Sequence, residues 1–487
     1  MKDNPTFHTA VYSASSFLVA IAGLITFPIL TRVLSVEEYG ILNLISLTIM
    51  VLVGLGKAGL QTSIVRFGSE ARSGNKGFKE NDVYLTALVS MFVIVVCLQL
   101  AWSIASQFLP LSMVGDERAY LIFILAGLLV IGEVVGSGLH NILISEKKSV
   151  VVSLVNIAKK YSLIALIVPG LLLSQEKIFT FYLLSGIHEI LFLLISLYLC
   201  QRYFAIFSGC FCPSLNRQLF AFGLPLIGFE VLGHIISFGD RVLINYFLGT
   251  AALGYYAAAS NLCVYIETVF VASMTTAITP IFLDRWEREG KESTENFLAL
   301  VMRYYLLVTI PAAIGVAAVG QDLITFLAGE KYAEGHRVIP YIIAGMLISG
   351  TSAITTAGLR IKKRTNLMMG IVAFVAVLNV AFNLALIPPF GIEGAAFATL
   401  LSFLGYTWLN YYFGRKILAI RFDVMPVLLY STAGLAMYMA VTAVDVPIVG
   451  LRLFLKIGVG VLVYSVLVLI IDRDIRRLVI GYVKPAW

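Results

Sequence analysis

The sequence predicts an all-α integral membrane protein of about 14 transmembrane helices, with two pseudo-symmetric six-helix lobes and two additional C-terminal helices. Of its 487 residues, 59% are hydrophobic and only 13% are charged, whereas about a quarter of the residues in soluble domains are charged. Apolar runs of about 20 residues, each able to cross a hydrocarbon core about 30 Å thick, recur along the whole chain. A weak internal repeat relates the two halves.

The expected spans follow one another with short connections. The first span is too long for the apolar core of a signal peptide and lacks a basic leader, so we expect it to be retained. If one segment were re-entrant, the number of spans would fall to twelve or thirteen. The expected spans are 10–33, 41–64, 82–106, 119–144, 149–173, 178–200, 218–244, 253–281, 296–319, 338–359, 366–387, 392–414, 424–444 and 449–471.

The distribution of lysine and arginine predicts that both termini are cytoplasmic. With the N-terminus inside, the cytoplasmic segments hold 23 basic residues and the opposite loops hold 8, and the bias alternates from loop to loop. Basic residues in short loops stay on the cytoplasmic side of a membrane. We therefore attribute the net charge of +7 to the basic residues of the cytoplasmic loops, and we expect no nucleic-acid partner.

Several classes of function are excluded by what the chain lacks. No loop exceeds roughly 20 residues, and no GxxxxGK[ST] phosphate-binding loop occurs, so ATP hydrolysis by this chain is excluded. The five cysteines lie in spans or on the reducing side, which argues against disulfides. Cys210 and Cys212 lack a nearby histidine or further cysteine, so we expect neither a metal nor a cofactor.

Short matches at a nearly constant offset indicate an internal repeat. Aligning the segment from Arg32 with the segment from Tyr246 pairs Gly40 with Gly254, an offset of 214 residues. The pairs Lys147-Lys148 and Lys362-Lys363 stand 215 residues apart. Each half holds an even number of spans, so the two halves are expected to be parallel repeats related by an axis along the membrane normal. The predicted lobes are 1–205 and 206–420, followed by two helices and a tail in 421–487.

Several motifs together resemble a known family. They are TRVLSVEEYG after the first span, the run DRVLINYFLGTAALGYYAAASN, the GLQTSIVRF end of the second span, and the layout of twelve spans followed by two. On these features the chain resembles the polysaccharide transporters of the MOP flippase superfamily, the Wzx-type flippases of O-antigen and other lipid-linked oligosaccharides. The resemblance covers essentially the whole chain and implies a MOP/MATE-like bundle of two lobes that works by alternating access.

Basic residues in the spans near the expected lobe interface are candidates for binding an anionic cargo. Lys57 lies roughly 24 Å from the outer end of its span, too deep to reach water easily, and Arg66 lies at the cytoplasmic mouth. Together they could receive a diphosphate. Arg32 is a possible exit contact, although Arg32 and Arg66 could equally be interfacial anchors. Lys160 could line the cavity.

The adjacent Lys159 and Lys160 lie at a depth compatible with Glu189 in the next span. We expect at least one of these lysines to form an ion pair within the lobe and leave open which one faces the cavity. Weaker candidates for intramembrane roles are Glu133, His140, His188 and Arg303.

Acidic residues and a histidine in the seventh and eighth spans are candidates for ion coupling. Glu230 lies near mid-membrane and His234 is four residues further on, so the two share a helix face and could bond to each other. Glu267 could be a third member, while a bond between Glu230 and His234 could also serve only to hold helices together. Asp240 and Arg241 match the family pattern best, and each is expected to pair with a neighbouring helix in a structural role.

The resemblance implies a flippase, not an enzyme. Its cargo would be a polyprenyl-diphosphate-linked oligosaccharide, such as an O-antigen, capsule or exopolysaccharide repeat unit, moved from the inner to the outer leaflet of the bacterial inner membrane. Expected partners are this glycan lipid, membrane lipids, and the polymerase and chain-length proteins of the same pathway. One alternative is an ion-coupled exporter of multidrug or organic-cation type, which predicts an acidic lumen. Another is a passive scaffold, in which removing the charges would have little effect.

Overall fold

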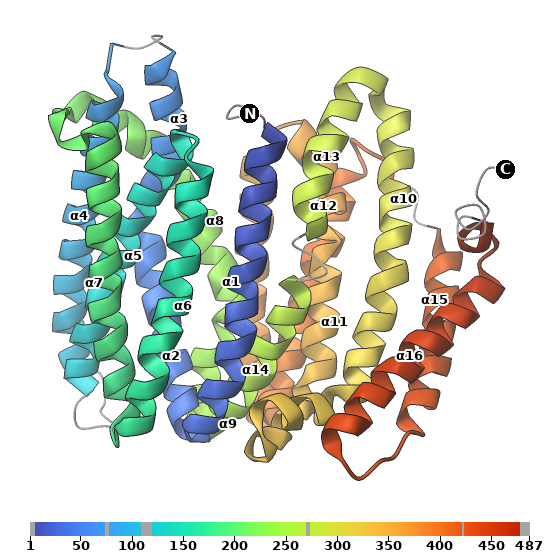
Figure 1. Ribbon diagram of the computed structural model, residues 1–487. Coiled ribbons are helices and arrows are strands. Elements are labelled where there is room, and N and C mark those ends of the chain that lie inside the picture. The colour runs from blue at the N-terminus through green and yellow to red at the C-terminus, as the bar shows by residue number, and fades with distance from the viewer. Residues whose placement is uncertain (1–4, 74–76, 109–118, 269–272, 421–422, 478–487) are drawn as a thin grey trace. The chain divides into compact units, whose positions relative to one another are not determined.

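The computed structural model describes residues 5–73, 77–108, 119–268, 273–420 and 423–477, and within these ranges it contains helices and no β-strand (Figure 1). The predicted all-α class is thereby confirmed. In lipid a helix satisfies every backbone hydrogen bond within one segment. The helices are α1 (Pro5–Val33), α2 (Val36–Lys57), α3 (Leu60–Arg72), α4 (Glu80–Ala105), η1 (Ser106–Phe108), α5 (Ala119–Ser145), α6 (Ser149–Leu173), α7 (Lys177–Phe204), η3 (Ile206–Ser208), α8 (Pro213–Phe238), α9 (Asp240–Glu267), α10 (Ser273–Ala328), η5 (Glu330–Val338), α11 (Ile339–Gly350), α12 (Ser352–Thr355), α13 (Ala357–Ile361), α14 (Thr365–Gly414), α15 (Val424–Thr442) and α16 (Val449–Ile471).

Twelve helical segments in the described ranges are long and apolar enough to cross a membrane. Three long helices turn back at a glycine with positive φ, namely Gly249, Gly290 and Gly391, and Figure 1 shows the two arms of α10 in yellow. In α14 the amide of Asn379 donates to Ser402 at 3.0 Å, which places the two arms side by side. The turns at Gly249, Gly290 and Gly391 each interrupt one of these twelve apolar segments. The number of fourteen spans expected from the sequence stays a prediction.

The internal repeat is visible in local geometry. Lys147 and Lys363 both adopt the left-handed conformation, with φ of 55° and 52°. In both turns the next residue donates its N–H, at 2.9 Å, to the carbonyl five positions earlier, which is the pattern of a helix-ending Schellman turn. The equivalent turns are therefore 216 residues apart, one more than the alignment of the lysine pairs indicated.

Contacts divide the chain into two compact units. The first unit contains residues 1–238 and 249–254, and the second contains 239–248 and 255–487. In the first unit α5 packs against α2, α4 and α7, and α1 packs against α6. The lobe boundaries predicted from the repeat, 1–205, 206–420 and 421–487, remain a prediction.

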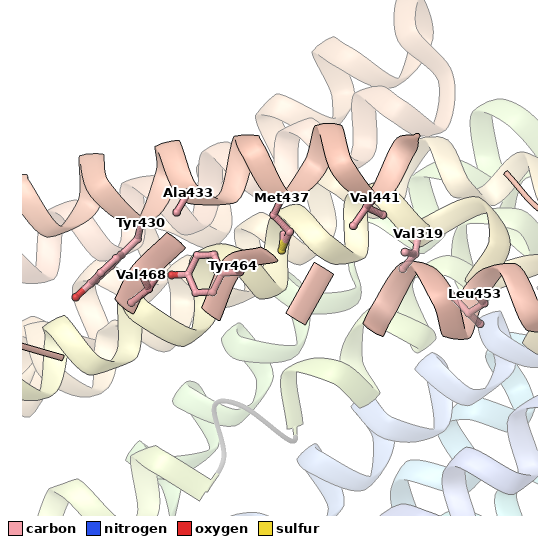
Figure 2. Packing of buried hydrophobic residues seen from close by; sticks show 8 residues of the cluster. All are labelled: Val319, Tyr430, Ala433, Met437, Val441, Leu453, Tyr464 and Val468. Carbon is pink, nitrogen blue, oxygen red and sulfur yellow. The ribbon is translucent and has the colours of Figure 1, made fainter. Parts of the chain in front are cut away.

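In the second unit the last two helices pack against the second arm of α10. An apolar cluster fills this contact, and Figure 2 labels its members, among them Tyr430 and Met437 of α15 and Tyr464 of α16. Where helices meet in water, the removal of apolar side chains from water stabilises their packing most. Within lipid this driving force is missing, and close van der Waals contact between the helices stabilises the packing instead.

A cluster of ion pairs lies at each end of the contact between α10 and α16. At one end Arg303 donates two hydrogen bonds to Asp472, at 2.8 and 2.9 Å, and Tyr430 donates a third at 2.8 Å. At the other end the buried Asp322 receives Arg452 and Lys456, each at 2.7 Å. Arg303, a candidate for an intramembrane role in the sequence, therefore lies in a contact that attaches α16 to α10.

Candidate functional site

A cavity of about 930 Å³ lies within the first unit. Six helices contribute to its wall, namely α1, α2, α5, α6, α7 and α8. Its apolar wall residues include Ile49, Met50, Val53 and Leu163. The charged residues that line it are Lys57, Glu133, Lys159, Lys160, Glu189 and Glu230, and His234 lies with them. A chamber with charged groups on several helices, in a segment otherwise built for lipid, is typical of a transport pathway.

Lys57 reaches the cavity because α2 ends there. The helix starts at a capping box formed by Ser35 and Glu38 and ends at Lys57, where a cation is favoured by the negative end of the helix dipole. The next two residues, Ala58 and Gly59, both adopt the left-handed conformation, with φ of 50° and 70°. The chain therefore breaks before α3 begins, immediately beside the lysine.

A close backbone contact fixes this break against α8. A Cβ atom placed on Gly59 would lie 2.1 Å from the carbonyl oxygen of Gly223, and one on Gly223 would lie 2.8 Å from the carbonyl oxygen of Ala58. Only glycine allows this approach at both positions. The contact holds the end of α2 beside α8, the helix that carries Glu230.

Glu230 faces α2 and α3 from α8. The Lys57 Nζ atom lies 3.4 Å from its Oε1 atom, and the Gln61 side-chain amide donates to its Oε2 atom at 3.4 Å. The two charged side chains are 22% and 30% exposed, so the pair remains open to the cavity. His234 lines the same cavity four residues along α8. The sequence left open a bond between this carboxylate and His234, and in the structure the carboxylate accepts hydrogen bonds from Lys57 and Gln61.

A second ion pair lies across the cavity, between α6 and α7. Lys159 Nζ lies 2.6 Å from Glu189 Oε1, and the Glu189 side chain is 6% exposed. A Cβ atom on Gly132 of α5 would lie 2.3 Å from the Cγ atom of Glu189, so this glycine makes room for the carboxylate. Lys160 also lines the cavity. The structure thus places both adjacent lysines at the cavity, with Lys159 in the ion pair.

The charges that line the cavity are balanced. Three lysines and three glutamates contribute, so the formal net charge is zero with His234 neutral. The cavity is therefore neither the acidic lumen expected of a cation exporter nor a purely basic pocket. An anion that binds here must take a lysine away from its carboxylate, and the more open Lys57–Glu230 pair is easier to separate than the shorter Lys159–Glu189 pair.

Three predicted site residues lie outside the residues that line this cavity. Arg66 pairs with Glu70 at 3.1 Å, one helical turn further on, and its guanidinium lies 4.4 Å from the centre of the Phe222 ring. Arg32 lies in the last turn of α1. Glu267 is the last residue of α9 and belongs to the second unit. The structure thus brings together Lys57, Lys160, Glu230 and His234 and leaves these three apart.

The residues of the family motif take part in contacts between helices. The buried Asp240 receives hydrogen bonds from Tyr256 and, at 3.3 Å, from Thr399 of α14. Arg241 donates to Asn261 at 2.9 Å, across the turn of α9. These contacts are of the structural kind that the sequence predicts, and the roles of both residues remain a prediction.

Gly40 and Gly254 meet in a reciprocal contact. A Cβ on Gly40 would lie 2.2 Å from the Thr250 carbonyl oxygen, and one on Gly254 would lie 2.1 Å from the Val36 carbonyl oxygen. Val36 and Thr250 precede the glycines by four residues, so both interactions follow the repeat offset of 214. The two glycines allow equivalent helix starts to touch backbone to backbone.

Sequence reasoning did not single out Gln61, Asn156 or Ser185, which are polar residues at or beside the cavity. Asn156 and Ser185 line it directly, and Gln61 contacts Glu230. Asn156 precedes Lys160 by one helical turn, and Ser185 precedes Glu189 by one turn. This spacing from a charged intramembrane residue was the available signal.

Comparison with known proteins places the fold and the family. Among curated proteins the chain is 24% identical over 258 residues to the "Probable low-salt glycan biosynthesis flippase Agl15" of Haloferax volcanii, covering 52% of this chain and 54% of that protein. It is 23% identical to the "Succinoglycan biosynthesis transport protein ExoT" of Rhizobium meliloti, covering 93% of this chain and 90% of that protein. It is also 28% identical over 216 residues to the "Uncharacterized membrane protein MJ1068" of Methanocaldococcus jannaschii, covering 44% of this chain. The chain spans about half the length of this protein and of Agl15, 42% and 54%.

Among solved structures, "Lipid II flippase MurJ, inward closed conformation" superimposes with a TM-score of 0.76 at 17% identity, covering 96% of this chain and all of that one. At this identity the likeness shows a shared fold, the MOP fold predicted from the sequence. The family described as "Polysaccharide biosynthesis protein" matches residues 8–286, which is more than half of the chain. The chain is a multi-pass membrane protein that belongs to the polysaccharide biosynthesis protein family.

Proposed function

We propose that this protein is a flippase that moves a polyprenyl-diphosphate-linked oligosaccharide from the cytoplasmic to the outer leaflet of a bacterial inner membrane by alternating access. The observation that carries the proposal is the cavity in the first unit, where an open lysine–glutamate pair lies in a chain of the polysaccharide biosynthesis family. The names of the glycan flippase, the succinoglycan transport protein and the lipid II flippase support the same class of cargo. Transport of this kind requires no catalytic step by the chain.

In the proposed mechanism the diphosphate contacts Lys57 and Lys160. Both lysines line the cavity, and charge-assisted hydrogen bonds from lysine to phosphate offset the cost of placing an anion among apolar helices. Lys57 is released when the anion displaces Glu230. Lys159 stays with Glu189, since their contact is shorter and the Glu189 carboxylate is more buried than that of Glu230. The lipid tail remains in the bilayer throughout.

The proposed orientation places both termini of the chain in the cytoplasm. After release at the outer leaflet, the polymerase and chain-length proteins of the pathway would receive the glycan lipid.

The test is complementation of a deletion strain, combined with transport of the strain's extracted lipid-linked glycan in proteoliposomes. Lys57→Ala should lower transport about tenfold or more, since a hydrogen bond to a charged group contributes about 1.5–3 kcal/mol. Glu230→Gln removes the competing carboxylate and should lower the KM for the glycan lipid. Lys291→Ala is the matched control, because Lys291 forms an exposed pair with Glu295 within α10.

Two results would contradict the proposal. If Lys57→Ala at normal expression shows full transport and full surface glycan, the assignment of Lys57 to the binding site is wrong. A deletion that leaves surface glycan intact but sensitises cells to cationic drugs would instead favour the multidrug or organic-cation exporter. A passive scaffold is excluded if the wild-type protein alone moves the glycan lipid in proteoliposomes.

A further inference from the structure

The cavity of the first unit has a second, uncharged end. Ser46 of α2 and Phe181, Tyr182 and Ser185 of α7 line it there. The Tyr182 hydroxyl donates to the Leu42 carbonyl at 3.2 Å, so the start of α7 lies beside the first half of α2. Ser46 and Ser185 bring hydroxyl groups to the cavity, Phe181 and Tyr182 bring aromatic rings, and none of the four side chains carries a formal charge.

Ser46 and Phe181 are separated along their helices from the charged residues, and Ser185 lies between Phe181 and Glu189, about 6 Å of helix rise from the carboxylate. Ser46 precedes Lys57 by eleven residues on α2, which corresponds to about 16 Å of helix rise. Phe181 precedes Glu189 by eight residues on α7, about 12 Å of rise. Phe181, Ser185 and Glu189 follow at intervals of four, so one face of α7 passes from aromatic to hydroxyl to carboxylate. A ligand that touches both ends must be longer than a diphosphate.

Ser185 carries a hydrogen-bonding group that the protein does not satisfy. The residue is 4% exposed, and among the described residues its Oγ atom has no hydrogen-bond partner. Serines in apolar helices usually bond to a carbonyl of their own helix, as Ser137 does at 2.7 Å to Val134. A buried hydroxyl without a partner is costly, so its partner is expected to come from what fills the cavity.

Next to Ser185 the wall is aromatic and held in place. The rings of Phe181 and Tyr182 meet edge to face with centroids 5.3 Å apart. Tyr182 is 1% exposed, and its hydroxyl is engaged by Leu42, so this ring has little freedom. Phe181 also lines the cavity. Flat apolar rings beside a few placed polar groups are the usual composition of a site for a small, mostly uncharged ligand.

We propose that Ser46, Phe181, Tyr182 and Ser185 form a subsite for an uncharged sugar ring of the glycan. The inference rests on the proposed function and extends it from the diphosphate to the sugars. A pyranose has an apolar face of C–H groups that packs on an aromatic ring, and its hydroxyl groups give and accept the bonds that Ser185 lacks. The diphosphate is at the lysines, and a sugar further along the chain is at this subsite.

The experiment compares two cargoes and three variants in proteoliposomes. The cargoes are the lipid-linked oligosaccharide extracted from the source strain and the same lipid trimmed to its first sugar. Ser185→Ala should lower the transport efficiency of the full oligosaccharide about two- to tenfold, the range for one lost neutral hydrogen bond. Phe181→Ala should lower it at least as much. Both variants should move the trimmed lipid at the wild-type rate, whereas Lys57→Ala should impair both cargoes.

Ser137→Ala is the matched serine control and should behave as wild type, because its hydroxyl is satisfied within α5. Binding of the free oligosaccharide, released from the lipid by mild acid, is measured separately by saturation-transfer NMR on the purified full-length protein. Wild type and Ser137→Ala should give a signal that Ser185→Ala and Phe181→Ala reduce.

Several outcomes separate the two proposals. Equal losses for both cargoes, or unchanged transport and binding in Ser185→Ala and Phe181→Ala, would overturn the sugar subsite and indicate a water-filled end. If the wild-type protein moves neither cargo, the proposed function fails, and the binding measurement then decides the subsite alone. Binding that is lost in both variants would support it, and binding that is absent or unchanged would refute it.

Discussion

Replacing Gly40 by alanine should destabilise the protein, and the structure gives the size of the effect. The new Cβ would lie 2.2 Å from the carbonyl oxygen of Thr250, where an ordinary contact needs at least about 3.0 Å. Two backbones must therefore separate by roughly 0.8 Å. The atom in the way belongs to a helix backbone, so no side chain can rotate to relieve the clash.

Two energies of opposite sign decide the net effect. Forcing an extra carbon into a packed contact costs about 1–3 kcal/mol, and a clash with backbone lies at the upper end. Replacing a glycine within a helix by alanine stabilises the helix by about 1 kcal/mol. We therefore expect Gly40→Ala to lower the free energy of unfolding by about 2 kcal/mol. Gly136→Ala in α5, where no atom lies within 4 Å, should instead raise it by about 0.5–1 kcal/mol.

The assay is reversible unfolding of the purified protein in mixed micelles by titration with SDS, followed by circular dichroism. The two variants should differ by about 3 kcal/mol with opposite signs relative to wild type. Gly254→Ala should resemble Gly40→Ala, because its Cβ would lie 2.1 Å from the Val36 carbonyl oxygen in the same contact. Stability of Gly40→Ala equal to that of Gly136→Ala would refute the reasoning from the reciprocal contact.

Two further predictions concern the ion clusters between α10 and α16. Burial raises the pKa of Asp472, but the hydrogen bonds that it accepts lower it more, so its pKa lies below the ordinary value of 3.8. The contribution of ionised Asp472 to the free energy of unfolding should be complete above about pH 4 and should be lost as the pH falls through the lower folded-state pKa. Thermal unfolding of Asp472→Asn, measured over the same pH range, should not show this loss. Asp322→Asn should lower the free energy of unfolding by about 3 kcal/mol because Arg452 and Lys456 lose their buried carboxylate. The control Asp445→Asn should change it by less than about 1 kcal/mol, since Asp445 is 93% exposed, and equal effects of the two substitutions would contradict the assignment.

The apolar helices could be predicted from the sequence because they depend on local properties. Apolar length decides whether a helix can cross a membrane. The repeat also showed in the sequence, since Gly40 and Gly254 permit the same close approach at equivalent helix starts. The pairing of Arg66 with Glu70 was not predicted, although residues four apart on a helix are neighbours.

The composition of the site could be predicted only in part. Lys57, Lys160, Glu230 and His234 were selected by their depth in the membrane, and the structure lines one cavity with all four. Depth alone gave no reason to separate them from Glu267, which belongs to the second unit. A depth estimate fixes position along a helix axis, whereas lining a cavity depends on the direction in which the side chain points.

Hydropathy and helix length act within one segment, so the amino-acid sequence is enough to identify a helical membrane protein with a repeat. The contacts of Lys57 with Glu230, 173 residues away, and of Lys159 with Glu189 follow from the three-dimensional fold. Those pairings depend on the break after Lys57, on the backbone contact of Gly59 with Gly223 and on the space that Gly132 leaves for Glu189. The physical reason is that charge pairing acts over a few ångströms in space, and distance along the chain does not fix which helices come that close.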